Sequence, residues 1–142
     1  MSSSTPASLY CTLVGAVLVI AGIIGFFYSA SFDTGAADVA ANTDDIFGIL
    51  GVNGWHNLVH IALGLLALAL AGSASGARAY CLGIGLVYVV LAIWGFLDSD
   101  GVLIGLIPVN DEDNVLHLVL GLVGLAAGAA TPIAAKAVPA KG

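Results

Sequence analysis

The stretch GVNGWHNLVHIALGLLALA (Gly51–Ala69) returns 57 residues later as PVNDEDNVLHLVLGLVGLA (Pro108–Ala126). Each copy contains two asparagines, and the residues after the second are apolar apart from one histidine. The matched positions include three identical pairs with polar or small side chains, namely Asn57 and Asn114, His60 and His117, and Gly64 and Gly121. Self-similarity at a fixed offset predicts that one structural unit is used twice.

The segments that precede these two copies also match each other, at an offset of 70. Tyr10–Cys11 corresponds to Tyr80–Cys81, and Gly25–Phe26 corresponds to Gly95–Phe96. The repeated unit is therefore a pair of apolar segments, with one copy at about 9–72 and the other at about 79–131. Because two spans return a chain to its starting side, both copies share one orientation, as in parallel-repeat membrane folds with a pseudo-two-fold axis along the membrane normal.

The composition excludes several classes of protein. Hydrophobic residues make up 60% of the chain and charged residues only 8%, whereas soluble domains carry about 25% charged residues. Three Lys and Arg stand against nine Asp and Glu, with a net charge of −6, so a nucleic-acid partner is not expected. The composition predicts an integral membrane protein surrounded by the lipid bilayer.

Four apolar stretches approach the length of about 20 residues that a helix needs to cross a bilayer. Their apolar runs are continuous rather than alternating, which favours helices over a barrel. We predict an all-α, polytopic protein: a four-transmembrane-helix up-down bundle of two tandem helical hairpins, forming one transmembrane domain over 1–142. The expected spans are Leu9–Ala30, Trp55–Gly72, Ala79–Leu97 and Asn114–Thr131.

Charge separates between the two sides of these spans. All nine acids lie between the first and second spans or between the third and fourth. Arg78 lies between the second and third spans, and Lys136 and Lys141 follow the fourth. The positive-inside rule then places both termini in the cytoplasm and the acidic loops outside the plasma (inner) membrane.

Each external loop also carries an apolar cluster followed by an asparagine. Ile46–Leu50 precedes Asn53, and Leu103–Ile107 precedes Asn110. Asparagine is a favoured helix N-cap, so we expect a helix to begin after each one. The apolar clusters are expected to fold onto the outer end of the bundle or to lie at the lipid interface.

His60 and His117 are the polar residues that matter most, because polar groups at membrane depth are costly and tend to be functional. Counting about 1.5 Å per residue from the caps places them roughly 10 Å below the external helix ends. Asn57 and Asn114 stand three residues earlier on the same helix faces. Gly64 and Gly121 stand four residues later and are expected to leave space beside each imidazole.

Two interpretations of these histidines are open. They can be structural residues whose hydrogen bonds fix how the hairpins meet. Alternatively they can bind a metal ion or a tetrapyrrole, with Asn57, Asn114 and Tyr88 as supporting groups. The acidic external end would repel haem propionates, which favours a metal cation or an esterified chlorin.

His56 is a weaker candidate for a third metal ligand. It precedes His60 by four residues, so the two side chains share a helix face. Its place three residues after Asn53 is, however, where side chains of a capping box lie. This position favours a role at the helix end.

The motifs HNLVH (His56–His60), ARAY (Ala77–Tyr80) and NVLHLVLG (Asn114–Gly121) resemble a bacterial membrane family catalogued as domain of unknown function 4383. The resemblance extends over most of the chain, from the first span to the fourth. It implies a four-helix bacterial membrane protein and brings no activity, cofactor or catalytic residue with it.

No complete catalytic set is found in the sequence, so we expect a protein that is not an enzyme. The first functional interpretation is a small structural or accessory subunit without a cofactor, whose partners are other membrane proteins or copies of itself. The alternative is a membrane protein that binds a metal or a tetrapyrrole at His60 and His117.

Overall fold

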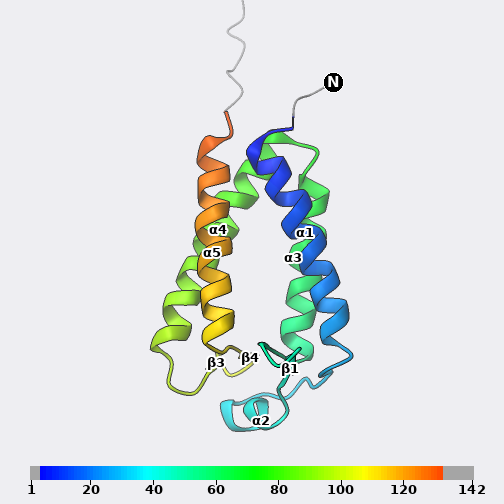
Figure 1. Cartoon of the computed structure of the whole chain (residues 1–142), viewed down its shortest axis with the longest axis vertical. Coiled ribbons are helices and arrows are strands. Elements are labelled where there is room, and N and C mark those ends of the chain that lie inside the picture. Colours follow the sequence, from blue (N-terminus) through cyan, green and yellow to red (C-terminus); the bar gives the residue numbers. More distant parts are fainter. Residues whose placement is uncertain (1–3, 133–142) are drawn as a thin grey trace, which may run out of the picture.

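The computed structural model describes residues 4–132. Over this range the chain is mostly helical, with two small antiparallel sheets at one end of the molecule (Figure 1). Its elements, in order, are α1 (Pro6–Gly25), α2 (Ala36–Ala41), β1 (Asp44–Ile46), β2 (Leu50–Val52), α3 (Gly54–Leu70), α4 (Ala74–Leu97), β3 (Val102–Leu103), β4 (Ile107–Pro108) and α5 (Asp111–Ala130).

Side-chain caps set where the long helices begin. The Asn53 side chain accepts the backbone N–H of His56 at the start of α3, and the Asn110 side chain accepts that of Asp113 at the start of α5. These contacts confirm both predicted caps. The start expected at Ala79 is wrong, because the Ser73 side chain caps the helix six residues earlier and places Arg78 inside α4.

Three helices, α1, α4 and α5, are long and apolar enough to cross a membrane. α3 is the shorter one, with 17 residues. At about 1.5 Å per residue it extends roughly 25 Å, which is less than the roughly 30 Å of a bilayer's hydrocarbon core. The length and composition of α1, α4 and α5 indicate that the chain is a membrane protein.

The four long helices form two hairpins, α1 with α3 and α4 with α5 (Figure 1). Glycines bring the helices of each hairpin into backbone contact. A Cβ on Gly64 would lie 2.7 Å from the Gly15 carbonyl oxygen, and one on Gly121 would lie 2.8 Å from that of Gly85. Since real Cβ atoms do not approach so closely, these helix pairs require glycine at both crossing points.

The hairpins converge at one end, which we call the closed end (Figure 1). The sulfur atoms of Cys11 and Cys81 lie 3.9 Å apart there, and both cysteines are free. The Tyr10 hydroxyl donates to the Leu120 carbonyl at 2.9 Å, and the Tyr80 hydroxyl donates to the Leu63 carbonyl at 3.0 Å. Each hairpin thus donates to the other through a buried tyrosine.

At the other end, which we call the open end, the hairpins spread apart and the connecting loops close the gap (Figure 1). β1 pairs with β2 and β3 pairs with β4. The Asn53 amide donates to the Leu106 carbonyl, and the Asn110 amide donates to the Ile49 carbonyl, both at 2.7 Å. The two caps therefore also fasten the two loops to each other.

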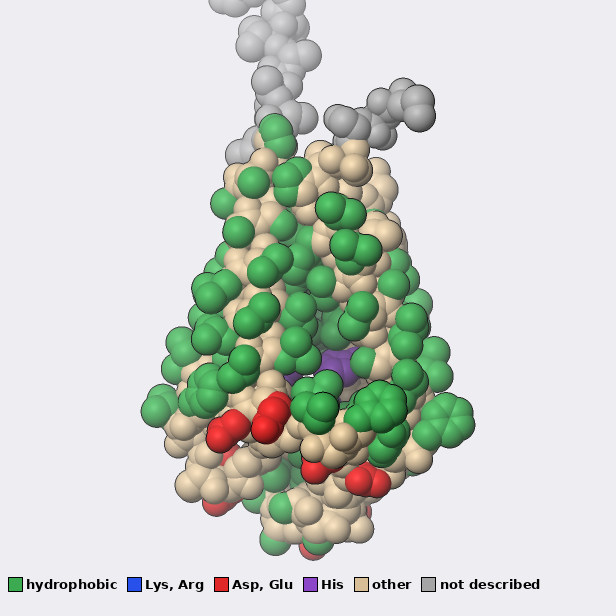
Figure 2. Space-filling model, viewed as in Figure 1, with side chains coloured by type: hydrophobic (Ala, Val, Ile, Leu, Met, Phe, Trp, Pro, Cys, Tyr) green, Lys and Arg blue, Asp and Glu red, His purple; other side chains and the backbone are tan. Residues whose placement is uncertain are grey.

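The apolar loop clusters divide between the interior and the surface. Ile46 and Leu103 are buried, whereas Phe47 is 75% exposed and Ile104 is 63% exposed. Phe47 and Ile104 also adopt positive φ angles of 55° and 49°, which orient them away from the core. Acidic residues gather at the same end (Figure 2). Lys136 and Lys141 lie outside the described residues.

Candidate metal-binding site

Three histidines meet between the two hairpins near the open end. His56 and His60 come from α3 and His117 comes from α5. One nitrogen of each ring lies within 4.8 Å of those of the other two. Figure 2 shows histidine side chains in the hollow between the hairpins, just inside the acidic residues. The fold therefore brings the predicted pair together and adds the third histidine to it.

His56 is held by the loop that precedes its helix. Its ring Nδ1 lies 2.8 Å from the Gly51 carbonyl oxygen, and because a carbonyl only accepts, Nδ1 carries the hydrogen. This tautomer leaves Nε2 with a free lone pair. A ring fixed in this way by a backbone carbonyl is typical of metal-ligating histidines. The His56 ring therefore does not cap its helix, although its backbone N–H is bonded to the Asn53 cap.

The helix-end role that the sequence favours for His56 is filled in the other copy by Asp113. The Asp113 carboxylate accepts the Asn110 backbone N–H at 3.1 Å and completes a capping box. The same carboxylate oxygen accepts the Gly51 N–H at 2.9 Å. The Gly51 peptide is thus bonded to His56 at its oxygen and to Asp113 at its nitrogen, so a buried carboxylate lies one peptide away from the histidine cluster.

Three other polar groups at the cluster have no hydrogen-bond partner within the described part of the chain. They are Nδ1 of His60, Nδ1 of His117 and the Tyr88 hydroxyl, all buried. Tyr88 stacks on His117, with ring centroids 5.2 Å apart and an interplanar angle of 12°. The Tyr88 hydroxyl therefore donates to neither His60 nor Asn57. Buried polar groups without partners are rare in native proteins, and each one calls for an explanation such as a bound ion or ligand.

The two asparagines do not bond to the histidines either. The Asn57 amide donates to the Ser29 carbonyl at 2.8 Å, beyond the end of α1. The Oδ1 atoms of Asn57 and Asn114 lie against Gly25 and Gly95, where an added Cβ would clash with them. These asparagines therefore support the packing within each hairpin, and the histidine rings stay free of them.

The space expected at the two glycines is filled by the partner helix of each hairpin. Val19 lies against Gly64 and Val89 lies against Gly121. The expectation that these glycines leave room beside the histidines is wrong, because the partner helix of the same hairpin already occupies their faces. A porphyrin face has no place there.

Two cavities lie on either side of the cluster, and His60, Tyr88 and His117 line both. The first, cavity A, has a volume of about 210 Å³ and is walled mainly by α1, α5 and the β1–β2 loop. The second, cavity B, has about 150 Å³ and is walled mainly by α3, α4 and the β3–β4 loop. Many residues that line cavity A have their matched residue, at an offset of 57 or 70, in the lining of cavity B. Leu116 in cavity A and Val59 in cavity B are one such pair.

The structure defines a class of protein with membrane-length apolar helices and a three-histidine cluster between two helical hairpins. The match of a family model over residues 9–130 is more specific: the chain belongs to the family described as domain of unknown function (DUF4383). Neither the comparison with curated proteins nor that with solved structures finds a match. The family bears out the resemblance seen in the sequence and assigns no activity.

Sequence reasoning gave less weight to His56 and found neither Gly51 nor the link to Asp113. The spacing of His56 and His60, four residues apart, was the available signal. The loop contact that turns the His56 ring toward His117 depends on the path of β2, which the sequence pattern does not reveal.

Proposed function

We propose that this chain is a multi-pass membrane protein that binds a transition-metal ion through His56, His60 and His117. One observation carries the proposal: three imidazoles from both hairpins place nitrogens within 4.8 Å of one another. Two of these rings, those of His60 and His117, keep a buried Nδ1 without a hydrogen-bond partner in the described part of the chain. Neutral imidazole is the commonest protein ligand for Zn²⁺, Cu²⁺ and related ions.

The donor set suits an ion that accepts three histidines and one exchangeable ligand. Zn²⁺ binds three protein ligands and a water in this way, with Zn–N bonds of about 2.0–2.1 Å. Tetrahedral bonds of that length place the nitrogens roughly 3.3 Å apart, so a bound ion would draw the rings together. The buried Asp113 carboxylate lies beyond Gly51 and offsets part of the ion's charge in a region of low dielectric.

A metal ion fits the surroundings better than a tetrapyrrole does. The cavities of about 210 Å³ and 150 Å³ are smaller than the roughly 300 Å³ at which sites for drug-sized ligands such as a tetrapyrrole begin. Acidic residues at the open end (Figure 2) would also repel propionates and attract cations. The ion therefore remains the simpler occupant of the cluster.

The proposed membrane arrangement has four spans in two tandem hairpins of the same orientation. The reciprocal bonds of Tyr10 and Tyr80 and the meeting of Cys11 with Cys81 support a pseudo-two-fold axis between the copies. The short α3 is accommodated by local thinning of the bilayer. Both termini are proposed to lie in the cytoplasm and the acidic loops outside the inner membrane, from the distribution of Lys and Arg.

We further propose that the protein acts without catalysis, as a small accessory subunit of a membrane assembly. Large apolar side chains are exposed along all four long helices, and lipid, other membrane proteins or further copies of the chain would cover them. In this role the metal site would hold or deliver an ion, and no nucleic acid takes part.

Metal analysis of the purified protein tests the proposal. The protein is extracted in a mild detergent with an affinity tag free of histidine, stripped with a chelator, and dialysed against Zn²⁺ or Cu²⁺. Mass spectrometry of the elements is expected to find about one ion per chain. The double variant that carries both His60→Gln and His117→Gln is expected to bind no ion.

The control is the double variant Cys11→Ala and Cys81→Ala, which removes the thiols at the closed end and leaves the histidines intact. This variant is expected to retain the ion. If the wild-type protein binds no metal while its helical circular dichroism is intact, or if the cysteine variant alone loses the ion, the assignment of a histidine site is wrong.

A further inference from the structure

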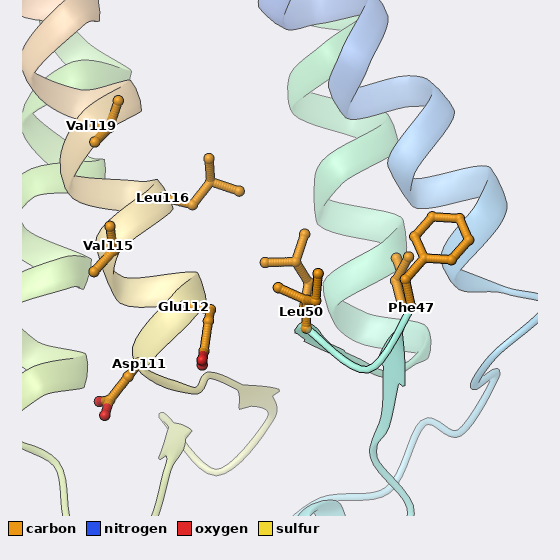
Figure 3. A pocket seen from close by; sticks show the side chains of 9 residues that line it. Phe47, Leu50, Asp111, Glu112, Val115, Leu116 and Val119 are labelled. Atoms are coloured by element: carbon orange, nitrogen blue, oxygen red, sulfur yellow. The ribbon is translucent and has the colours of Figure 1, made fainter.

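Cavity A adjoins a groove on the surface of the molecule. The groove has a volume of about 490 Å³ and lies between the β1–β2 loop and α5 (Figure 3). It shares Ile46, Leu50 and Leu116 with cavity A. Figure 3 shows Phe47 and Leu50 on one side of this groove, with Leu116 and Val119 on the other. The groove and cavity A together form an apolar passage from the surface of the protein to the histidine cluster.

The inner end of the passage is polar and lacks partners. The Tyr88 hydroxyl and Nδ1 of His117 are buried and form no hydrogen bond with any other described residue. Tyr88 is only 3% exposed and His117 only 5%. The two rings are stacked nearly parallel, at 12°. Tyr88 and His117 line cavity A and cavity B alike, and the Tyr88 hydroxyl is a buried donor without an acceptor among the described residues.

The size of cavity A limits what can lie against these two rings. An apolar cavity of about 150 Å³ accommodates benzene, so the 210 Å³ of cavity A admits one substituted six-membered ring. A longer apolar tail on that ring would extend through the groove toward the lipid. Flat rings stack on aromatic side chains with a gain of about 0.5–1.5 kcal/mol beyond burial.

The outer rim of the groove selects by charge. Asp111 and Glu112 line it (Figure 3), and the described residues that line the groove and cavity A include no Lys or Arg. Anionic phospholipids and fatty acids are therefore repelled. At the matched positions of the other hairpin stand Gly54 and Trp55, and Trp55 packs edge-on against Phe32 at 5.0 Å. The acidic rim thus belongs to cavity A and not to cavity B.

We propose that cavity A binds a neutral, single-ring quinone carried on an apolar tail, with Tyr88 donating a hydrogen bond to a ring carbonyl. The ring lies against the stacked Tyr88 and His117, and the tail follows the groove out to the membrane. A quinone meets all three conditions, since it is flat, uncharged and rich in acceptors. This site goes beyond metal binding and does not require the ion.

Binding is measured by calorimetry on chelator-treated protein in a non-ionic detergent, so that the result is separate from that of the metal analysis. The probe is a benzoquinone with a decyl tail. Decylbenzene, which lacks acceptors, and decanoate, which is anionic, serve as matched probes. We expect one quinone to bind per chain, and both matched probes to bind at least 5-fold more weakly, as about 1 kcal/mol or more of lost interaction implies.

Two substitutions at matched positions locate the site. Leu116→Trp fills the junction between cavity A and the groove, and is expected to weaken quinone binding more than about 10-fold. Val59→Trp introduces the same side chain in cavity B at a similarly exposed position, 42% against 40% for Leu116. The affinity of this control for the quinone is expected to be within about 3-fold of that of the wild type, because substitutions at separate sites act independently.

Tyr88→Phe tests the hydrogen bond, because it keeps the ring and removes the hydroxyl. Loss of one neutral hydrogen bond corresponds to about 2- to 10-fold weaker binding. Tyr80→Phe, whose hydroxyl donates at the closed end, is the control and should bind as the wild type does. Absence of quinone binding, equal binding of decylbenzene, or equal losses in Leu116→Trp and Val59→Trp would each overturn the proposal.

Discussion

At both the closed and the open end, residues of one hairpin meet the matched residues of the other. The two ends differ in whether their buried polar groups are hydrogen-bonded. At the closed end, Tyr10 and Tyr80 each donate to a carbonyl of the other hairpin. At the open end, the Tyr88 hydroxyl has no hydrogen-bond partner within residues 4–132, and Tyr88 stacks on His117, whose Nδ1 also lacks one there. In a membrane interior an unsatisfied polar group is expensive. The bonded tyrosines therefore stabilise the closed end, whereas the proposals above assign the unpartnered groups of the open end to ligand binding.

The largest expected effect comes from separating the helices on which both ends depend. Gly121→Val places a methyl group about where the Gly85 carbonyl oxygen and Val89 already lie. Overpacking of this kind costs about 3 kcal/mol, and we expect a loss of that size in denaturant unfolding followed by circular dichroism. Gly83→Val is the control, because nothing lies within 4 Å of a Cβ there. Equal stability of the two variants would contradict the close approach of α4 and α5.

The open end should gain stability from a bound ion. A ligand present at 100 times its dissociation constant stabilises the folded state by about 2.7 kcal/mol. Thermal unfolding of the protein is expected to shift upward with Zn²⁺ or Cu²⁺ and to return on addition of a chelator. The variant that carries both His60→Gln and His117→Gln should show no shift. A shift of unchanged size in that variant would place the ion elsewhere.

Removing a hydroxyl at the closed end should have a smaller effect. Tyr10→Phe or Tyr80→Phe deletes one hydrogen bond between the hairpins, worth about 0.6–1 kcal/mol in a membrane protein. Unfolding measurements on each variant and on the double variant are expected to show this loss, with the two losses nearly additive. Unchanged stability in the double variant would mean that these bonds do not hold the hairpins together.

The smallest effect should come from the same change at the open end. Tyr88→Phe removes a hydroxyl without a partner, so the stability of the protein free of ligand should change by less than about 0.5 kcal/mol. A small gain in stability would also agree with this interpretation, because the substitution removes a buried polar group that has no partner among the described residues. A decrease of more than about 1 kcal/mol would show that Tyr88 is bonded in the folded protein, and would remove the contrast between the two ends.

Sequence reasoning reached the helices and their caps because these depend on local chemistry. The asparagines at 53 and 110 begin α3 and α5 as predicted, and the start of α4 was missed because Ser73 caps it from within an unremarkable polar stretch. The strands β1 to β4 and the helix α2 were not predicted, since elements of two to six residues carry too little periodicity to recognise.

The candidate site was partly predictable for the same reason. His60 and His117 were found because the repeat marks them, and both face the gap between the hairpins with rings near that of His56. His56 and the cavities depend on how the loops fold over the open end, which involves contacts between residues such as Gly51 and Asp113, 62 positions apart. Contacts over such distances in the chain leave no local pattern.

The meeting of Cys11 with Cys81 has a consequence for how this molecule can vary. With the proposed pseudo-two-fold axis, this contact between equivalent residues lies at the axis, so two identical hairpins could associate through it as a dimer. In such a dimer every substitution would appear twice. Because the two halves are covalently linked in one chain, each half can change independently of the other. Position 88 can therefore be tyrosine while the equivalent position 18 is leucine, and one cavity can differ from its counterpart in the other half.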